Sequence, residues 1–358
     1  MEKKLKLIDT RFKSKRVLVT GSTGFKGSWL CEYLLHLGAD VTGVADKVYD
    51  GDSHFSLIGL DDRIVQVYAD IRDADAIDRI IFDNDFDFIF HLAAQPLVKE
   101  AYANPRYTFN VNAQGTINLL DAIYRKNASV TCVFITSDKC YENVEQIWGY
   151  RETDVLGGKD PYSASKAMAE IAISSYKRSI ISNNSIRIAT ARAGNVIGGG
   201  DFAADRIIPD AIRCVVEKKS LMIRSPNATR PWQHVLEPLN GYLNLAIWLE
   251  DLTEYENCDH AYNFGPSDQS EFLVTDVIDR LIGQGLDFSA TVHDENTQYE
   301  AKLLKLNCDK AYYDLGWSAK LSFYETIERL AVWYLAYIDG HQNLADVTRN
   351  QIKDYHEK

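Results

Sequence analysis

The stretch RVLVTGSTGFKG, from Arg16 to Gly27, decides the fold. Its first five residues form a short apolar run of the kind that builds a buried strand. Glycines then recur at every third position, at Gly21, Gly24 and Gly27, and Ser28 to Leu37 continues with apolar residues at helical spacing. Strand, glycine-rich turn and helix in this order can hold a pyrophosphate, because glycine lets backbone N–H groups approach the anion and the helix N-terminus favours negative charge. We therefore expect an α/β fold that binds a dinucleotide.

Further along the chain, apolar runs alternate with helical patterns, as in a doubly wound parallel sheet. The expected strands lie at residues 40–45, 63–68, 87–91, 130–135, 185–192, 221–223 and 261–265. The expected helices lie at residues 73–82, 107–126, 162–180, 239–249, 275–281 and 321–337. Asp46 ends the second strand, where a carboxylate can accept hydrogen bonds from a ribose diol and repel a 2′-phosphate. Asp46 therefore favours NAD over NADP, with a plain turn residue as the alternative.

Other contacts with the dinucleotide are expected from the glycine turn and from the carboxyl ends of the strands, where open parallel sheets bind their ligands. Small residues after the strand at 87–91 would let a flat ring lie against the backbone. The expected contacts are Thr23, Phe25, Lys26, Asp70, Ile71, Leu92, Ala93, Ala94, Gln95 and Thr136.

A polar run follows the fifth expected strand, where Ser137, Asp138 and Lys139 bring a hydroxyl, a carboxylate and an amine to a strand end. Such residues also make ordinary surface turns, so the run alone does not establish a site. Tyr162 and Lys166 begin the following helix and lie four positions apart, on one face. An ammonium near a phenol stabilises the phenolate and lowers the pKa of the tyrosine, which suits Tyr162 to general acid–base catalysis. Together with the glycine turn, these five residues predict an active site.

The composition is that of an acidic globular protein. The chain has 358 residues, 46% apolar and 25% charged, enough for one large α/β unit with an added lobe. Its net charge of −12 argues against general affinity for nucleic acid or anionic membranes. We see no apolar run long enough to span a bilayer, and residues 1–15 lack the apolar core of a secretory signal. Six scattered cysteines without metal-ligand spacing predict free thiols in a reducing cytoplasm and no metal site.

Several motifs together resemble the extended short-chain dehydrogenase/reductase superfamily of NAD-dependent enzymes that act on nucleotide sugars. The resemblance rests first on Gly21, Gly24, Gly27, Ser137, Tyr162 and Lys166. It extends to residues 91–98, 193–201 and 230–238, and covers the chain from about residue 15 to about residue 340. The run Ser137 to Lys139 is similar to the sugar-nucleotide 4,6-dehydratases, most of which carry Thr or Ser followed by Asp-Glu. Lysine in the third place departs from that pattern.

The resemblance implies a Rossmann-type NAD-binding fold and an internal oxidation, elimination and reduction of the sugar. Tyr162, assisted by Ser137, would take the proton of the 4-hydroxyl while hydride leaves C4 for NAD. Asp138 would protonate the leaving hydroxyl, and the hydride would return at C6, so NAD would stay tightly bound and be regenerated in each turnover. Lys139 stands where related enzymes carry a glutamate base for C5, and both a base role and an electrostatic role remain open.

The expected organisation is a lead at residues 1–15, an NAD-binding domain at 16–195 with a return at 232–266, a smaller α+β substrate lobe at 196–231 and 267–340, and a polar tail at 341–358. By resemblance, helices matching residues 107–126 and 163–180 pair across a two-fold axis, in a four-helix bundle that makes a homodimer or homotetramer. The resemblance also implies CDP-glucose as substrate. Its expected contacts are Gln95, Arg192, Asn195, Arg206, Arg230 and His234.

Two kinds of alternative share these features. A 4-epimerase, or a dehydratase of UDP-, dTDP- or GDP-sugars, would have the same fold, but an epimerase needs no acid or base beside Ser137. A non-catalytic NAD-binding sensor or scaffold often loses the tyrosine or the lysine, whereas this chain has both Tyr162 and Lys166. The resemblance implies that the product enters deoxysugar synthesis for surface polysaccharides such as the lipopolysaccharide O-antigen.

Overall fold

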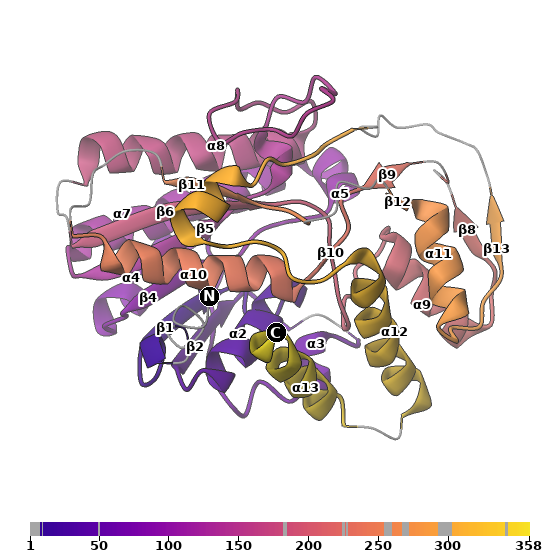
Figure 1. The fold of residues 1–358 in the computed structure, drawn as a ribbon. Helices are drawn as coiled ribbons and strands as arrows, with labels where there is room; N and C mark the ends of the chain where they lie inside the picture. Colours follow the sequence, from indigo (N-terminus) through magenta and orange to yellow (C-terminus); the bar gives the residue numbers. More distant parts are fainter. Residues whose placement is uncertain are drawn as a thin grey trace.

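The computed structural model describes residues 8, 10–48, 51–181, 185–223, 226, 228–253, 260–266, 272–292, 303–340 and 343–358. Its centre is a seven-stranded parallel sheet with the order β11-β6-β5-β4-β1-β2-β3 (Figure 1). The strands are β1 (Arg16–Thr20), β2 (Asp40–Ala45), β3 (Val65–Tyr68), β4 (Phe88–His91), β5 (Val130–Ile135), β6 (Ile186–Ala193) and β11 (Ala261–Phe264). The expected doubly wound sheet is confirmed. Its strand order reverses between β1 and β4, the position where such sheets bind ligands.

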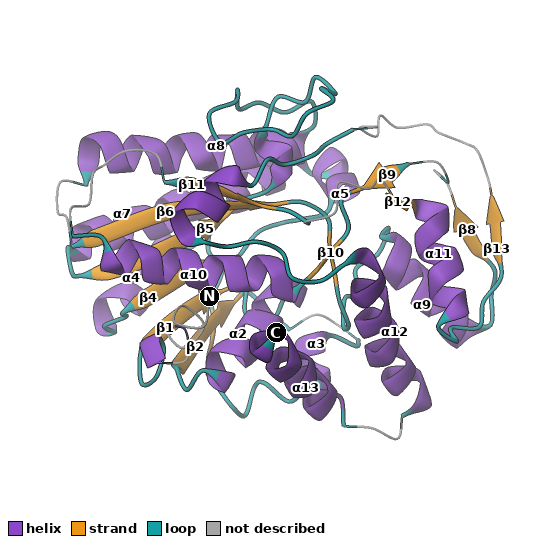
Figure 2. Ribbon diagram, viewed as in Figure 1, coloured by secondary structure: helices purple, strands orange, loops and turns teal. Residues whose placement is uncertain are grey.

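Helices cover both faces of the sheet (Figure 2). One face carries α2 (Phe25–His36) and α10 (Leu236–Asp251), and the other carries α4 (Ala74–Asp83), α7 (Gly115–Lys126) and α8 (Pro161–Ser175). Successive residues of β1 point to opposite sides, so that Val17 and Val19 join the first core and Leu18 joins the second. Apolar side chains on both faces of a strand explain why the strands read as nearly continuous apolar runs.

Local signals set the helix ends. Asp73 caps α4 as predicted, because its carboxylate accepts a hydrogen bond from the N–H of Ala76 at 3.0 Å. Pro161 starts α8, where its missing N–H leaves no bond unmade. The helix expected at residues 107–126 is built from three consecutive segments: α6 (Pro105–Phe109), the π-helical η1 (Asn110–Gln114) and α7. A second π-helical segment, η3 (Tyr176–Ile180), continues α8 in the same way.

A smaller group of elements lies beside the large sheet, at the right of Figure 1. Its helices are α9 (Ile207–Glu217), α11 (Val274–Gly283) and α12 (Phe323–Asp339). Its strands form three pairs: β7 (Val196–Ile197) with β10 (Gln233–His234), β9 (Thr229–Arg230) with β12 (Phe272–Leu273), and β8 (Leu221–Ile223) with β13 (Ala290–Val292). The shorter helical segments of the molecule are α3 (His54–Leu57), α5 (Val98–Ala103), η2 (Asp138–Cys140) and η4 (Ala311–Leu315). One hydrophobic core extends from Val17 of β1 to Trp333 of α12 and joins the two groups.

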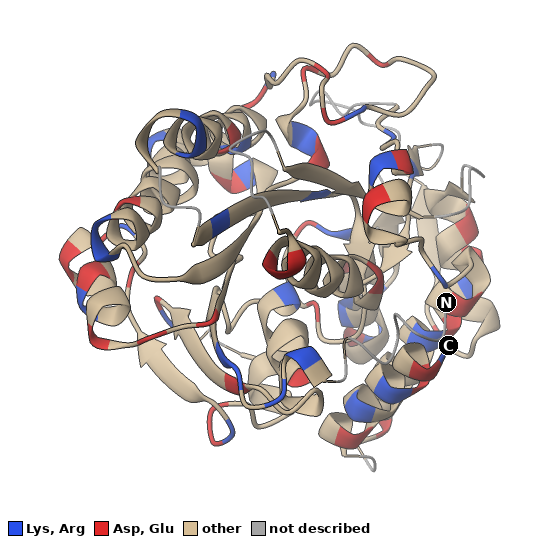
Figure 3. Ribbon diagram, turned by 60° about the vertical axis from the view of Figure 1, so that its left-hand side comes forward, with Lys and Arg blue, Asp and Glu red and all other residues tan. Residues whose placement is uncertain are grey.

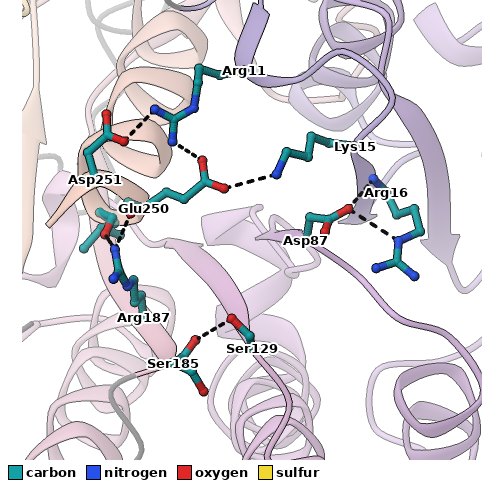
Figure 4. Close-up of polar contacts among 10 residues, drawn as sticks. Arg11, Lys15, Arg16, Asp87, Ser129, Ser185, Arg187, Glu250 and Asp251 are labelled. Carbon is teal, nitrogen blue, oxygen red and sulfur yellow. Dashed lines mark hydrogen bonds and ion pairs between the residues drawn. The ribbon is translucent and has the colours of Figure 1, made fainter. Parts of the chain in front are cut away.

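The lead at residues 1–15 is only partly described, since residues 1–7 and 9 lie outside the described ranges. We expected this lead to be solvated, and for its described residues, 8 and 10–15, that expectation is wrong. Ile8 and Phe12 are buried in the main core, and Arg11 pairs with Glu250 at the end of α10 (Figure 4). An apolar side chain every fourth residue, flanked by charge, lets this segment cover the sheet.

The polar tail expected at residues 341–358 is instead helix α13 (Leu344–Glu357), which packs against α12 and α2. Its mean composition is polar, but its apolar residues recur at helical spacing. The buried side chains include Leu344, Val347, Ile352 and Tyr355. Tyr355 donates a hydrogen bond to the buried carboxylate of Glu237 at 2.7 Å, so the end of the chain is tied to α10.

Lys and Arg are interspersed with Asp and Glu along the outer helices, including α13 (Figure 3). None of the described helices is long and apolar enough to cross a membrane. Within the described ranges, no group of three or more His, Cys, Asp or Glu side chains could hold a metal ion. Free thiols are present at Cys31, Cys132, Cys140, Cys214 and Cys308, and Cys258 lies outside the described residues.

Candidate active site

The glycine turn after β1 is shaped for close approach of a ligand. Gly21 has a φ of +74°, and a Cβ there would lie 2.8 Å from the backbone nitrogen of Ala93, which follows β4. A Cβ at Gly27 would lie 2.0 Å from the carbonyl oxygen of Gly21, so α2 packs directly on the turn. The first turn of α2, Phe25 to Ser28, is free of acidic residues in the sequence, which suits its N-terminus to an anion. These features fit the pyrophosphate of a dinucleotide.

Asp46, Asp70 and Ile71 follow β2 and β3 and lie toward one corner of the sheet. The guanidinium of Arg72 donates to Asp70 at 2.5 and 3.0 Å, and this contact lowers the pKa of Asp70. The hydrogen bond to Asp70 also raises the pKa of Arg72, and the nearby carboxylate of Asp46 adds to that rise. Asp46 and Asp70 therefore face the same polar corner, beside the ring of Tyr107.

The remaining expected cofactor contacts differ in how they are held. Leu92, Ala93 and Ala94 are half-buried after β4, where a flat ring can reach their backbone. Gln95 is turned inward, because its Nε2 donates to Thr108 at 2.8 Å and its Oε1 accepts from the N–H of Leu97 at 2.5 Å. Likewise, Thr136 donates its hydroxyl to Glu170, and Thr23 donates to the carbonyl of Lys47 at 2.7 Å.

The five expected catalytic residues come together at the end of β5. Ser137 donates its hydroxyl to Asp138 Oδ1 at 2.9 Å and accepts from the N–H of Lys139 at 3.2 Å. Its hydroxyl also shares a hydrogen bond with Tyr162. Lys166 lies one turn along α8, with Nζ 3.3 Å from the last carbonyl of β5. The turn η2 and the start of α8 thus present a hydroxyl, a carboxyl, a phenol and two ammonium groups in one place.

Burial raises the pKa of Tyr162 to about 12, and the hydrogen bond with Ser137 offsets only part of this rise. The prediction of a lowered pKa for Tyr162 is therefore wrong for this structure. Burial destabilises the phenolate more than the hydrogen bond with Ser137 and the charge of Arg206 stabilise it. Burial also lowers the pKa of Lys166 to about 8, against the opposing effect of the Glu170 carboxylate.

The surroundings of Asp138 favour its protonated form. Burial raises the pKa of its carboxyl, and the ammonium of Lys139 and the hydrogen bond from Ser137 work against that rise. Its Oδ2 lies against the loop after β6, where a Cβ on Gly194 would come within 2.9 Å. Lys139 itself is half-buried on η2.

Of the expected substrate contacts, Arg206 lies close enough to the catalytic cluster for its charge to act on both Tyr162 and Lys26. Its guanidinium donates to Asp201 at 2.8 Å and is 36% exposed. The backbone carbonyl of Asn195 accepts a hydrogen bond from the N–H of Gln233 in β10 at 3.2 Å. Arg230 lies on β9, in the smaller group of elements.

Two expected substrate contacts are placed elsewhere. Arg192 points from β6 into the interior, where its guanidinium is bound by Glu170 at 2.8 and 2.9 Å. His234 is fully buried against Trp29 of α2, and burial lowers the pKa of His234 to about 3, so its ring is neutral. Both side chains are therefore held in the interior by contacts with other elements, Arg192 by Glu170 of α8 and His234 by Trp29 of α2.

Sequence reasoning missed two residues beside the cluster. Tyr242 of α10 accepts a hydrogen bond from Lys26 Nζ at 3.5 Å, but α10 is apolar nearly all round and offers no pattern that singles it out. Glu170 did leave a signal, because it follows Lys166 by four residues on the same face of α8.

Comparison with known proteins shows the family to which the chain belongs. The family model described as GDP-mannose 4,6 dehydratase matches residues 18–330. CDP-glucose 4,6-dehydratase of Salmonella typhimurium is 41% identical over 356 residues, with 98% of each chain covered. The dTDP-glucose 4,6-dehydratase of Shigella flexneri is 24% identical, with 93% of this chain and 96% of that enzyme covered.

Solved structures agree in fold. UDP-glucose 4-epimerase of Thermotoga maritima, determined with UDP-glucose, matches with a TM-score of 0.77 at 20% identity, covering 90% of this chain and 99% of its own. The dTDP-glucose 4,6-dehydratase of Bacillus anthracis, determined with NAD, matches with a TM-score of 0.74 at 19% identity, covering 94% and 100%. From the family model and the relative from Salmonella typhimurium, the chain belongs to the nucleotide-sugar 4,6-dehydratase family that the GDP-mannose 4,6 dehydratase model describes.

Proposed function

We propose that this protein is an NAD-dependent lyase that converts CDP-D-glucose into CDP-4-dehydro-6-deoxy-D-glucose and water. The observation that carries the proposal is the buried carboxyl of Asp138, held by Ser137 beside Tyr162. Oxidation or epimerisation at C4 needs only Ser137, Tyr162 and Lys166, whereas loss of water needs an acid for the leaving hydroxyl. The choice of a cytidine nucleotide is supported by the relative from Salmonella typhimurium.

Oxidation at C4 begins with Tyr162, which takes the proton of the 4-hydroxyl while Ser137 hydrogen-bonds the same oxygen. The step requires the phenolate, which the hydrogen bond with Ser137 and the charge of Arg206 favour against burial. Lys166 lies one turn along α8, with its Nζ 3.3 Å from the last carbonyl of β5. When bound, NAD supplies the redox chemistry, accepting hydride from C4 and returning it at C6. The glycine turn would hold its pyrophosphate, and Asp46 its ribose.

Elimination follows from the 4-keto group, which acidifies the C5 hydrogen. Asp138 gives its proton to the C6 hydroxyl, which leaves as water, and the C5 proton passes to a base. Lys139 is close enough to lower the pKa of Asp138, and it either accepts the C5 proton or stabilises the enolate. The partly buried Lys139 can accept the C5 proton only after its ammonium has lost a proton.

The two lobes divide the work. Residues 16–195 and 232–266 would hold NAD, and residues 196–231 and 267–340 would hold the nucleotide sugar. The charge of Arg206, which acts on Lys26 and Tyr162, supports this division. A homo-oligomer through α7 and α8 is supported by Met168 and Ile171, which are 48% and 57% exposed on α8. We place the protein in the cytoplasm, on a route to deoxysugars of surface polysaccharides, in keeping with its free thiols.

A direct assay tests the proposal. The protein is incubated with NAD and, separately, with CDP-glucose, dTDP-glucose, UDP-glucose and GDP-mannose, and products are followed by mass spectrometry. CDP-glucose should lose 18 mass units and give a 4-keto-6-deoxy sugar. Dehydration of another sugar nucleotide with none of CDP-glucose would overturn the substrate assignment, and no dehydration of any of them would overturn the enzyme assignment.

A further inference from the structure

A buried ion pair lies behind the catalytic turn and takes no part in the mechanism above. It joins Glu170 of α8 to Arg192 of β6, and both side chains are 4% exposed. Arg192 donates from Nε to Glu170 Oε1 at 2.9 Å and from Nη2 to Oε2 at 2.8 Å. Burial opposes the carboxylate, but the charge and hydrogen bonds of Arg192 outweigh it and lower the pKa of Glu170, so the pair is ionised.

This pair contacts both ends of the catalytic turn. Thr136, immediately before the turn, donates its hydroxyl to Glu170. Tyr141, immediately after it, accepts a hydrogen bond at Oη from Arg192 Nη1 at 2.8 Å. The residues between them, Ser137 to Cys140, contain the hydroxyl and the carboxyl of the proposed mechanism.

Glu170 also ties the turn to the helix that carries the phenol. It lies one helical turn after Lys166 and two after Tyr162 on α8. Thr190 of β6 donates to its Oε2 at 2.9 Å, so β5, β6 and α8 meet at one carboxylate. Movement of the turn relative to α8 would therefore break several charge-assisted hydrogen bonds at once.

We propose that Glu170 and Arg192 form a clamp that positions the catalytic turn, setting the Ser137 hydroxyl and the Asp138 carboxyl relative to Tyr162. They are positioning residues and do not touch the substrate. The inference rests on the proposed function for its kinetic test, but not for its structural test.

An ion pair suits this task better than apolar packing does. A buried pair often adds little net stability, because desolvating two charges costs as much as their attraction returns. It does fix direction, since a carboxylate and a guanidinium impose angles on each partner. Here the partners are the hydroxyls of Thr136 and Tyr141, which flank the turn, and that of Thr190 on β6.

The clamp also sets the charge state of the site. Lys166 faces Glu170 on its own helix, Cys140 in the turn, Lys26 on α2 and His91 on β4. Among these, the Glu170 carboxylate favours the ammonium, against burial. Without that carboxylate the pKa of Lys166 falls further, and Lys166 loses its proton at a lower pH.

The test uses the full-length double variant Glu170→Leu/Arg192→Met, which leaves no unpaired buried charge. Replacing both members of a buried pair by apolar groups of similar volume is often neutral for stability, so the variant should fold. The control is Glu32→Leu/Arg63→Met, because Glu32 is 1% exposed and accepts from Arg63 at 2.6 and 2.9 Å, away from the turn. The second partner of Glu32, the 42% exposed Arg349, keeps its ion pair with Asp346. Thermal melts confirm that both variants are folded.

The first readout is independent of activity. Cys140 is fully buried inside the turn, and Cys132 is fully buried in β5. In the clamp variant, iodoacetamide should alkylate Cys140 about tenfold faster, by mass spectrometry of peptides, while Cys132 stays protected. In the control variant both thiols should react as in the wild type.

The second readout is kinetic. The clamp variant should lose about 10- to 100-fold in kcat with less than a threefold change in KM, because a misplacement near 1 Å at the reacting groups has effects of this size. Its alkaline loss of kcat should begin at lower pH than in the wild type. If the wild type fails with CDP-glucose, the proposed function fails, and the Cys140 readout alone then decides the clamp.

Wild-type Cys140 protection in the folded clamp variant would overturn the inference, as would wild-type kcat with an unmoved pH profile. A kcat loss equal to that of the control variant would show a general structural effect and would overturn it too.

Discussion

Asp138 is the residue on which dehydration depends, and its surroundings prepare it. The fold buries the carboxyl beneath the loop after β6, where it accepts a hydrogen bond from Ser137 at 2.9 Å. Burial raises its pKa, which keeps the proton available for a leaving hydroxyl. Such a carboxyl destabilises the folded protein once it is ionised, which ties activity to stability.

Asp138→Asn should therefore lower dehydration by about 10²- to 10⁴-fold, the usual contribution of a positioned acid, while oxidation at C4 persists.

The same variant should be more stable than wild type at pH 8. The pKa of Asp138 is higher in the folded than in the unfolded protein. Ionisation of Asp138 therefore costs the wild type no stability at a pH below the unfolded-state pKa, and the cost grows as the pH rises through the folded-state pKa. Denaturant unfolding at pH 5 and pH 8 measures this gain. The exposed Asp62, changed to Asn, is the control, and a gain that is absent at pH 8 contradicts the account.

Lys139→Gln should lower dehydration at least about tenfold, since a base needs the neutral amine of Lys139 and an electrostatic group needs its ammonium. Lys139→Arg separates the two roles, because arginine keeps the charge but cannot act as a base near neutral pH. Product formation and deuterium uptake at C5 in D₂O are measured together. Wild-type dehydration by the glutamine variant would remove Lys139 from the mechanism.

The glycine turn is the element that the sequence predicts best, because its conformation depends on the three glycines themselves. Backbone contact at Gly21 and Gly27 leaves no room for a side chain. The strands of the large sheet are predicted nearly to the residue, since both their faces are buried. The three-part helix α6–η1–α7 is not, because a π turn leaves the apolar pattern almost unchanged.

Gly27→Ala should abolish measurable NAD binding and lower the free energy of unfolding by about 1–3 kcal/mol or more, because the new Cβ would lie 2.0 Å from a backbone oxygen. Isothermal titration with NAD and denaturant unfolding measure the two effects. Gly283→Ala is the matched control, since a Cβ there meets nothing within 4 Å. Tight NAD binding by the Gly27 variant would contradict the assignment of the turn.

At the scale of the whole molecule, the chain ends show where sequence reasoning stops. The described residues before β1 (8 and 10–15) and helix α13 are polar on average, yet each buries apolar side chains against elements far away in sequence. The site has the same limit. Ser137, Asp138 and Tyr162 follow from local motifs. The inward turn of Arg192 and His234 depends instead on contacts with other elements, Glu170 of α8 and Trp29 of α2. Local patterns do not contain that information.

Tyr355→Phe should lower the free energy of unfolding by about 1–3 kcal/mol, because it removes one hydrogen bond from the buried carboxylate of Glu237. The backbone N–H groups of Lys320 and Leu321 would remain as its partners. Denaturant unfolding measures the loss, and Tyr313→Phe, at an 80% exposed position, is the control. Equal stability of the two variants would show that α13 is not fastened through Glu237.

The measurement that tests the central claim most directly is the fate of deuterium placed at C4 of CDP-glucose. The account predicts a 4-keto-6-deoxy product, lighter by water, that carries the deuterium at C6. Deuterium returned to C4 with the 6-hydroxyl intact would indicate an epimerase, and a dehydrated product without deuterium at C6 would exclude the internal transfer; either result contradicts the account.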